Sequence, residues 1–322
     1  MKRWTALLLS AMLMLSLAAC GGTETAEDSA QPQDDTIKII TTIFPEYDWM
    51  RNIIGEAPGV ELDLLIDNGV DLHSFQPSVG DMVEISDCDV FIYTGGVSDD
   101  WVEEALNNAT NKDMVVVNLM DVVSQHRETH LHEHEAGADE EHQHISDEHI
   151  WLSVHNAEFI CETLTDTMIE VDPANADMYI VNLENYLEEL ATLDERYGET
   201  ISQAKYDTVV FGDRFPFAYL ADDYGLKYQA AFVGCSAETE VGFGTIAGLA
   251  TTLDETGIAN VLTIDGSDGK IAETVVSSTA SQDQNILTME SMQAVTREQI
   301  DAGATWLGYM NDNLSVLEQA LN

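Results

Sequence analysis

Eight short runs of β-branched and apolar residues, in two sets of four, constrain the fold of this chain more than any other feature of its sequence. The first set lies at 36–44, 60–66, 89–95 and 114–120, and the second at 207–213, 227–232, 260–266 and 285–289. A segment of helical character follows each run. Short apolar strands that alternate with helices indicate parallel sheets covered on both faces. The sequence therefore predicts an α/β fold of two lobes, each with a four-stranded, mainly parallel sheet flanked by helices.

One long helix is predicted between the two sets. Asp172 is expected to cap it, with Pro173 at its first position, and apolar residues follow at spacings of three and four as far as Tyr197. At ~1.5 Å per residue this helix would be roughly 40 Å long and would join the lobes rigidly. We expect a ligand in the cleft between the lobes, at the carboxyl ends of the strands. The predicted domains are an N-terminal lobe at 37–170, the linking helix at 171–204 and a C-terminal lobe at 205–322.

The N-terminus has the pattern of a secretory signal. Lys2 and Arg3 precede a short apolar run, and a small-residue cleavage site follows at 17–19. The ending "LAAC" resembles a bacterial lipobox, so residues 1–19 are expected to be a lipoprotein signal peptide and Cys20 a lipid anchor, although an ordinary export signal is the alternative. Residues 20–36 are predicted to be a flexible tether. The protein is then expected on the extracytoplasmic face of the cell membrane.

Charge and cysteine content exclude several classes of protein. Lysine and arginine number 12 against 59 aspartates and glutamates, so the formal net charge is 12 − 59 = −47. Such a charge repels nucleic acid, and no nucleic-acid partner is expected. Cys88, Cys161 and Cys235 are far apart and form no C-x-x-C pair, so we expect buried thiols and no disulfide framework.

Polar residues near the ends of predicted strands could hold a metal ion. His73 and His149 lie in loops of the first lobe, Asp213 follows the first strand of the second lobe, and Asp265 and Asp268 follow its third strand. Imidazoles combined with carboxylates suit zinc and also manganese or iron, whereas calcium and magnesium prefer oxygen ligands. The sequence therefore predicts a site for a divalent transition metal.

Three segments carry a resemblance to a known family. "DLHSFQPS", "CDVFIYTGGVSDDWVEEAL" and "DEHIWLSVHNA" are similar to segments of the zinc/manganese-binding solute-binding lipoproteins of bacterial ABC importers, and the similarity extends from Ile37 to the C-terminus. The resemblance implies that His73 and His149 are metal ligands. It also implies an ABC permease in the membrane as the partner, and we expect the receptor to be a monomer.

The third ligand departs from the family pattern. The family has His or Glu three residues before a Phe and five before an aromatic residue, and in this chain Arg214 occupies that place. A guanidinium cannot bind a metal, so either Asp213 substitutes or another group completes the site. The fourth position falls near Asp268, with Asp265 as the less favoured choice. Glu238 and Glu240, in "CSAETE", are interpreted as structural or interlobe groups.

A histidine-rich loop is predicted at 126–148. It holds six histidines and eight acidic residues and cannot bury enough apolar surface to fold alone. We interpret it as a weak collector of zinc, with a merely solvated insertion as the alternative. The resemblance implies that zinc-type members often carry such a loop and that manganese-type members generally lack it, so the loop and the two histidine ligands together favour Zn²⁺ over Mn²⁺ here. The auxiliary metal-binding residues are predicted to be His130, His132, His134, His142 and His144.

The leading hypothesis is a lipid-anchored receptor that captures zinc and delivers it to an ABC permease. A manganese or iron receptor, or an adhesin of the same fold, is the alternative within the family. A zinc-dependent hydrolase would need a general base beside a metal-bound water, and the sequence contains no H-E-x-x-H motif. We therefore expect that the protein is not an enzyme.

Overall fold

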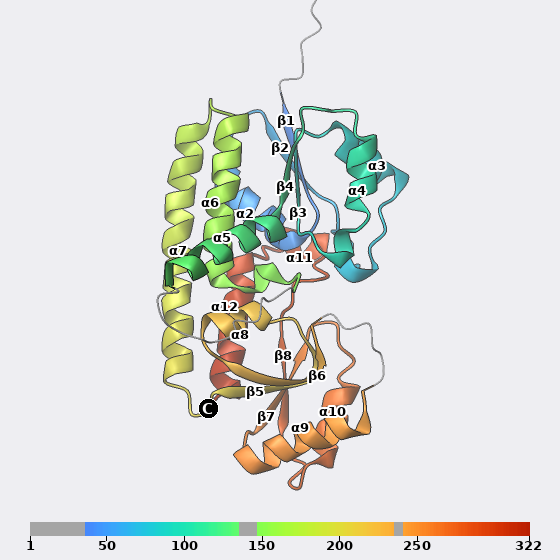
Figure 1. Cartoon of the computed structure of the whole chain (residues 1–322), viewed down its shortest axis with the longest axis vertical. Helices are drawn as coiled ribbons and strands as arrows, with labels where there is room; N and C mark the ends of the chain where they lie inside the picture. Colours follow the sequence, from blue (N-terminus) through green and yellow to red (C-terminus); the bar gives the residue numbers. More distant parts are fainter. Residues whose placement is uncertain (1–35, 135–146, 235–240) are drawn as a thin grey trace, which may run out of the picture. The chain divides into compact units, whose positions relative to one another are not determined.

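The computed structural model describes residues 36–134, 147–234 and 241–322, and residues 36–322 form one compact unit (Figure 1). The predicted signal peptide, Cys20 and most of the predicted tether lie outside the described residues. His142, His144, Cys235, Glu238 and Glu240 lie outside them as well.

The first sheet contains four parallel strands in the order β2-β1-β3-β4. The two central strands, β1 and β3, bury consecutive side chains because helices cover the sheet; β3, for example, buries Val90, Phe91 and Ile92. The strands are β1 (Ile37–Thr41), β2 (Val60–Leu64), β3 (Val90–Tyr93) and β4 (Val115–Asn118).

The second sheet repeats this topology with the order β6-β5-β7-β8, again with parallel pairing throughout. Its strands are β5 (Thr208–Phe215), β6 (Lys227–Val233), β7 (Asn260–Ile264) and β8 (Asn285–Met289). The two four-stranded parallel sheets predicted from the sequence are thus confirmed.

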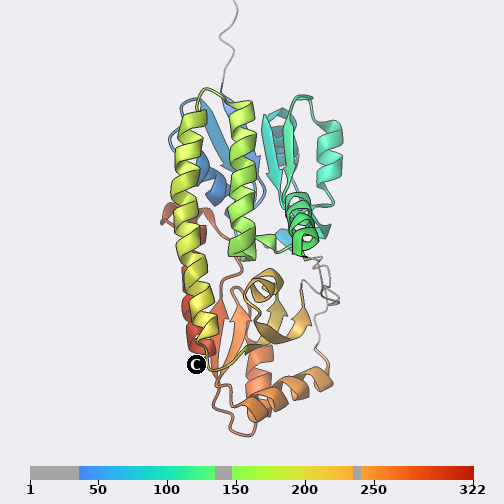
Figure 2. The ribbon, with the colours of Figure 1, turned by 60° about the vertical axis from the view of Figure 1, so that its left-hand side comes forward.

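Helices cover both sheets, and no helix of the described residues is long and apolar enough to cross a membrane (Figures 1 and 2). In the first half they are α2 (Phe44–Ile54), α3 (Val79–Asp87), α4 (Val102–Asn108), α5 (Leu119–His134), α6 (Val154–Val171) and α7 (Ala176–Ser202). In the second half they are α8 (Ala218–Asp223), α9 (Phe243–Thr256), α10 (Lys270–Ser278), α11 (Arg297–Asp301) and α12 (Trp306–Ala320). Short 3₁₀ turns are η1 (Leu72–Ser74), η2 (Val97–Asp99) and η3 (Ile150–Leu152).

Helix α7 is the predicted long helix, and it contacts α6, α2 and α12 (Figure 2). The predicted N-cap was wrong: Asn175 is the N-cap of α7, whereas Asp172 is the C-cap of α6, directly after its last residue Val171. The Asp172 carboxylate accepts hydrogen bonds from the Asn175 amide and from the Tyr179 hydroxyl, so it stabilises the turn between the two helices. The apolar stripe of α7 is core packing, as predicted, and its buried members are Tyr179, Tyr186, Leu190, Leu193 and Tyr197.

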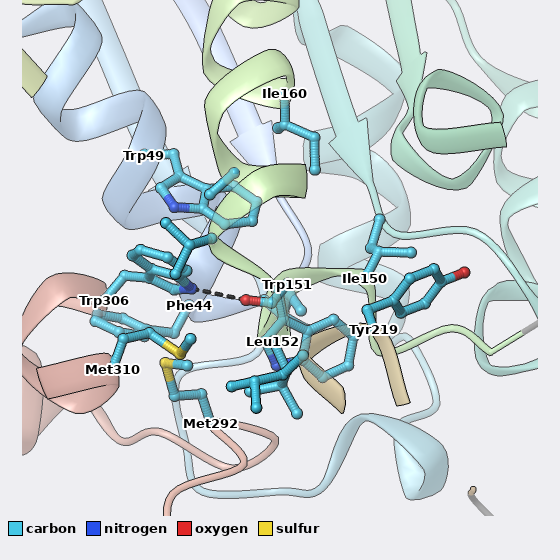
Figure 3. Close-up of a cluster of buried hydrophobic side chains, with 14 of the residues drawn as sticks. Phe44, Trp49, Ile150, Trp151, Leu152, Ile160, Tyr219, Met292, Trp306 and Met310 are labelled. Carbon is cyan, nitrogen blue, oxygen red and sulfur yellow. Dashed lines mark hydrogen bonds between the residues drawn. The ribbon is translucent and has the colours of Figure 1, made fainter. Parts of the chain in front are cut away.

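Three tryptophans join segments from both halves of the chain in one core (Figure 3). Trp306 of α12 donates its Nε1–H to the Trp151 carbonyl at 2.9 Å, and its ring lies 5.6 Å from that of Trp49 on α2. Trp151 in turn donates to the carbonyl of Ser291, which follows β8, at 2.8 Å. Each indole is at most 1 % exposed. The two halves are therefore packed against each other through the residues that surround η3.

The histidine-rich segment begins as a helix and not as a loop. Helix α5 extends to His134, so 126–134 of the predicted loop is helical. Leu119 and Val123 are buried at the start of α5 and fix its first turn. Once a first helical turn has formed, extending the helix costs little free energy, especially through residues of high helix propensity such as Gln, Arg, Glu and Leu. His130, His132 and His134 therefore have a helical backbone.

Candidate metal site

His73 lies in the η1 turn that follows β2. The Asp71 carboxylate caps this turn and accepts from the His73 backbone N–H at 2.9 Å, while the buried Leu72 anchors it to the core. The His73 ring is in the first half of the chain, but the Leu72 N–H donates to the Gln293 carbonyl of the second half. The position of the turn is thus fixed from both sides.

His149 precedes η3, whose side chains Ile150, Trp151 and Leu152 are all buried. This apolar anchor holds the His149 side chain at 0 % exposure, and the rings of His149 and Trp151 are 5.1 Å apart. Trp151 is therefore a packing residue beside the imidazole, as predicted. The Asp147 Oδ1 atom lies 2.8 Å from the His149 backbone N and 2.5 Å from its Nδ1. Asp147 thus orients the imidazole.

The structure brings His73 and His149 together. Their ring centroids are 5.4 Å apart and the ring planes are nearly perpendicular. With zinc–nitrogen bonds of ~2.0–2.1 Å, two imidazoles on a tetrahedral ion would have centroids roughly 5 Å apart. The observed separation therefore fits a single ion shared by the two rings.

Each of the two rings turns its Nδ1 toward a carboxylate. The His73 Nδ1 lies 3.2 Å from the Glu148 Oε1 and 2.6 Å from the Ser98 hydroxyl, and the His149 Nδ1 faces Asp147. A metal held by either ring would therefore be bound through Nε2. Carboxylates on the opposite nitrogen fix the tautomer of a ligand histidine and raise its basicity.

Glu148 is suited to this task because it is ionised. Burial raises the pKa of its carboxyl, but the hydrogen bonds from His73 and from the Ser98 N–H and hydroxyl outweigh burial and lower the pKa to about 2. The neighbouring Asp99 is different, because burial raises its pKa to about 6. One carboxylate close to His73 is thus firmly charged and the next is easily protonated.

Asp213 and Arg214 lie within β5, and not after it as predicted, because the strand continues to Phe215. The register of β5 against β6 shifts between Phe211 and Arg214. Gly212 lies in this irregularity, and a Cβ there would be 2.5 Å from the Cα of Ala272, so only glycine allows the close approach of α10. Asp213 is buried, and its Oδ1 accepts from the Arg214 N–H at 2.8 Å.

A cavity of about 550 Å³ adjoins Asp213 and Arg214. Its lining includes Asp265 and Asp268 from the second half and Asp71 from the first half. Asp265 is held by the Ser291 N–H, and the exposed Asp268 pairs with Lys270, which lowers the pKa of Asp268. The cavity therefore gathers three of the predicted acidic residues, each with a hydrogen-bond partner in the protein.

The predicted ligands occupy two groups. His73 and His149 form one, whereas Asp213 and Asp268 line the cavity, whose lining also includes Asp71, two residues before His73. Among the described residues no group of three or more His, Cys, Asp or Glu side chains is close enough to hold a metal ion. The assignment of Asp213 and Asp268 as ligands stays a prediction.

Ser98, Glu148 and Tyr219 at this site were not predicted as functional residues. Glu148 was counted only among the acids of the histidine-rich segment, although its place next to His149 is a signal that it could act on the site. Tyr219 is the aromatic residue five positions after Arg214 in the third-ligand pattern, and no function was predicted for it. Its hydroxyl donates to the Asp147 carbonyl at 3.0 Å. No sequence signal points to Ser98, which reaches His73 only through the fold.

Two further histidines have structural partners. His126 stacks on Phe159 of α6 with ring centroids 3.8 Å apart, so it is packed and not part of a mobile collector. His155 lies 2.8 Å from Asp194 and 3.5 Å from Asp223. Cys88 and Cys161 are buried free thiols, as predicted.

Comparisons with known proteins agree on one family. The family described as zinc-uptake complex component A, periplasmic, matches residues 39–320. The chain is 30% identical over 330 residues to the high-affinity zinc uptake system protein ZnuA of Bacillus subtilis strain 168, and this alignment covers 99% of the chain and 98% of that protein. It is 29% identical over 319 residues to the zinc-binding lipoprotein AdcA of Streptococcus pneumoniae strain R6, with 97% of the chain but only 60% of AdcA covered.

A solved structure has the same fold. The crystal structure of the Zn(II)-bound ZnuA-like domain of Streptococcus pneumoniae AdcA matches with a TM-score of 0.69 and 25% sequence identity. The match covers 89% of the chain and 99% of that domain. It agrees with the two parallel sheets described above.

Proposed function

The chain belongs to the zinc-uptake complex component A family, and on that premise we propose that it captures a zinc ion outside the cytoplasm and delivers it to an ABC permease in the membrane. The observation that carries this proposal is the pair His73 and His149, with ring centroids 5.4 Å apart and both Nδ1 atoms facing carboxylates. This arrangement presents two imidazoles, fixed in orientation, to one cation.

The donor set favours zinc as the cargo. Neutral imidazole nitrogens bind zinc strongly, whereas manganese has lower affinity for the same groups and accepts more oxygen ligands. Mn²⁺ remains the second candidate, since two imidazoles with carboxylates also suit it. The similarity to named zinc-binding proteins supports Zn²⁺.

Carboxylates of the second half would complete the metal site. Asp213 is the proposed third ligand because it is a buried carboxylate beside the cavity that adjoins the first half. Asp268 is the proposed fourth, and it would have to exchange its contact with Lys270 for the metal.

In addition to the site at His73 and His149, the auxiliary histidines are proposed to hold zinc weakly. His130, His132 and His134 lie along α5, and His142 and His144 follow in the sequence. Repeated imidazoles among acidic residues bind zinc without a single fixed geometry. They would raise the local zinc concentration near the tight site.

The remaining proposals concern location and assembly. Cys20 is proposed to carry the lipid that anchors the receptor to the membrane, and the domain limits of 37–170, 171–204 and 205–322 are retained as proposals. The receptor is proposed to act as a monomer and without catalysis. An adhesin function of the same surface stays an alternative.

Calorimetry with zinc tests the proposed function. We expect tight, stoichiometric binding by the wild type, and loss of that event when His73 and His149 are both changed to alanine. Deletion of 135–146, which leaves α5 intact, should keep the tight event and remove only weaker ones. Changing His126 to Gln serves as the control, because that ring packs on Phe159. Loss of the tight event on deletion of 135–146 would contradict the assignment.

A further inference from the structure

Helix α8 contacts the segment that carries His149. The Tyr219 hydroxyl donates to the Asp147 carbonyl at 3.0 Å, and the carboxylate of the same Asp147 holds the His149 ring. Tyr219 is 3% exposed. The Tyr219 hydroxyl is therefore linked to the His149 imidazole through one intervening residue, Asp147.

Asp223, also on α8, holds the other end of this segment. Its side chain is 3% exposed and accepts a short hydrogen bond from the Ser153 hydroxyl. Ser153 directly follows the buried η3 turn (Ile150–Leu152) and is the N-cap of α6. A bond to Ser153 therefore fixes the C-terminal end of η3. The segment 147–153 is thus bonded to α8 on both sides of His149.

Arg127 binds α8 to the first half of the chain. Its guanidinium donates to Asp223 at 2.8 Å and to Asp222 at 3.2 Å, and lies 4.8 Å from the centre of the Tyr219 ring. Its Nε donates to the Asn156 side chain at 3.0 Å. Arg127 therefore bonds to α8 and to the start of α6 at the same time.

The charges around Asp223 favour a single arrangement of α8 and the 147–153 segment. Burial raises the pKa of Asp223, but the contacts with His155 and Arg127 outweigh burial and lower it, so the carboxylate is ionised. Removing the charged partners and the hydroxyl donor from a buried carboxylate costs free energy, because the charge is then left without compensation. Movement of α8 away from 147–153 would therefore be opposed.

We propose that Tyr219 and Asp223 are positioning residues for His149, which hold both ends of its segment so that the imidazole has its metal-binding orientation before the ion arrives. The inference rests on the proposed zinc function. A ligand held ready for binding loses less conformational freedom when the ion arrives. Loss of a group that orients a ligand typically reduces metal affinity by about 10-fold to 100-fold.

The test compares variants that remove one polar group each. Tyr219→Phe removes only the hydroxyl, and Asp223→Asn removes only the charge. The matched controls are Tyr224→Phe, whose hydroxyl bonds to Asp194, and Asp222→Asn, whose carboxylate is 57% exposed and also pairs with Arg127. Zinc affinity is measured by competition with a chromophoric chelator. The cobalt(II) absorption spectrum is measured as well, since it reports the geometry of the metal and not the stability of the fold.

We expect about 10-fold weaker zinc binding and an altered cobalt spectrum for Tyr219→Phe and Asp223→Asn, and wild-type behaviour for both controls. If Asp223→Asn does not fold, Tyr219→Phe decides alone. Wild-type affinity and an unchanged spectrum in Tyr219→Phe would overturn the inference while leaving the zinc function intact. A wild type that binds no zinc would overturn the proposed function itself.

Discussion

The Nδ1 atom of His73 lies 3.2 Å from the Oε1 atom of Glu148, the residue directly before His149. One proposed ligand is thus oriented by the chain neighbour of the other. Asp147 orients His149 in the same way, so two adjacent carboxylates serve the two imidazoles. A displacement of the 147–149 segment would disturb both rings together.

Glu148→Gln is expected to weaken zinc binding by about 10-fold to 100-fold, because an amide cannot supply the negative charge that orients the His73 ring and raises its basicity. Calorimetry of the purified variant measures this. Glu104→Gln, on the exposed face of α4, is the control and should bind as the wild type does. Equal affinities of Glu148→Gln and the control would mean that Glu148 has no part in binding.

Asp213→Ala is expected to weaken zinc binding by at least ~10-fold if its carboxylate completes the site. The comparison is with Asp207→Ala, which removes an exposed carboxylate that pairs with Lys227. Both variants change the net charge equally, so a difference between them cannot come from the overall charge. If both variants bind zinc alike, the third ligand is another group.

Replacing His155 with Gln should lower the free energy of unfolding below neutral pH, and should lower it by a smaller amount in alkaline solution. The hydrogen bond with Asp223 is the main cause that raises the pKa of His155, to about 9, and Asp194 adds to it, while burial opposes it. Because the folded pKa lies above the unfolded value, the stabilisation is complete below about pH 6.5 and is lost as pH rises through about 9.

The side chain of His155 is 44% exposed, so solvent screening limits the effect to about 1 kcal/mol. Urea unfolding of the wild type and His155→Gln at about pH 6 and about pH 10 measures it. Loss of packing on Tyr224 should persist at both values. A stability difference that does not change with pH would refute the ion-pair explanation.

Salt is expected to stabilise this protein. With a net charge of −47, the acidic side chains of the folded protein repel one another. Raising NaCl from ~0.1 M to ~1 M shortens the Debye length from ~10 Å to ~3 Å and so screens this repulsion. Each kcal/mol gained would raise the melting temperature by about 2–4 °C. Calorimetric melting at several NaCl concentrations checks this, with choline chloride to separate screening from sodium binding. A melting temperature that falls with salt would contradict it.

The strands and the long helix could be predicted because their signals are local. All eight runs became strands, and the long helix expected between the two sets is α7. Asp172 shows the limit of such reasoning, since Asp before Pro is a good N-cap pattern, yet the Asp172 carboxylate bonds to Asn175 and Tyr179 across a turn. Which of two nearby polar residues begins a helix is decided by tertiary packing.

The histidine pair was predicted through the family resemblance, whereas the residues that orient it were found only in the structure. Ser98 and His73 are 25 residues apart, and Tyr219 and Asp147 are 72 residues apart. Contacts of this kind depend on the strand order β2-β1-β3-β4 and on the packing of α8, neither of which leaves a periodic pattern in the sequence.

The core that contains Trp49, Trp151 and Trp306 has a consequence for how cargo leaves the receptor. Separating the two halves would expose parts of these indoles to water, and at ~25 cal/mol per Å² with ~150–250 Å² for each ring, full exposure of all three sets an upper bound of roughly 10–20 kcal/mol. Complete separation of the halves by thermal motion is therefore strongly disfavoured. Release of zinc from the proposed site would then depend on movement of the loops that carry the ligands, and not on separation of the halves.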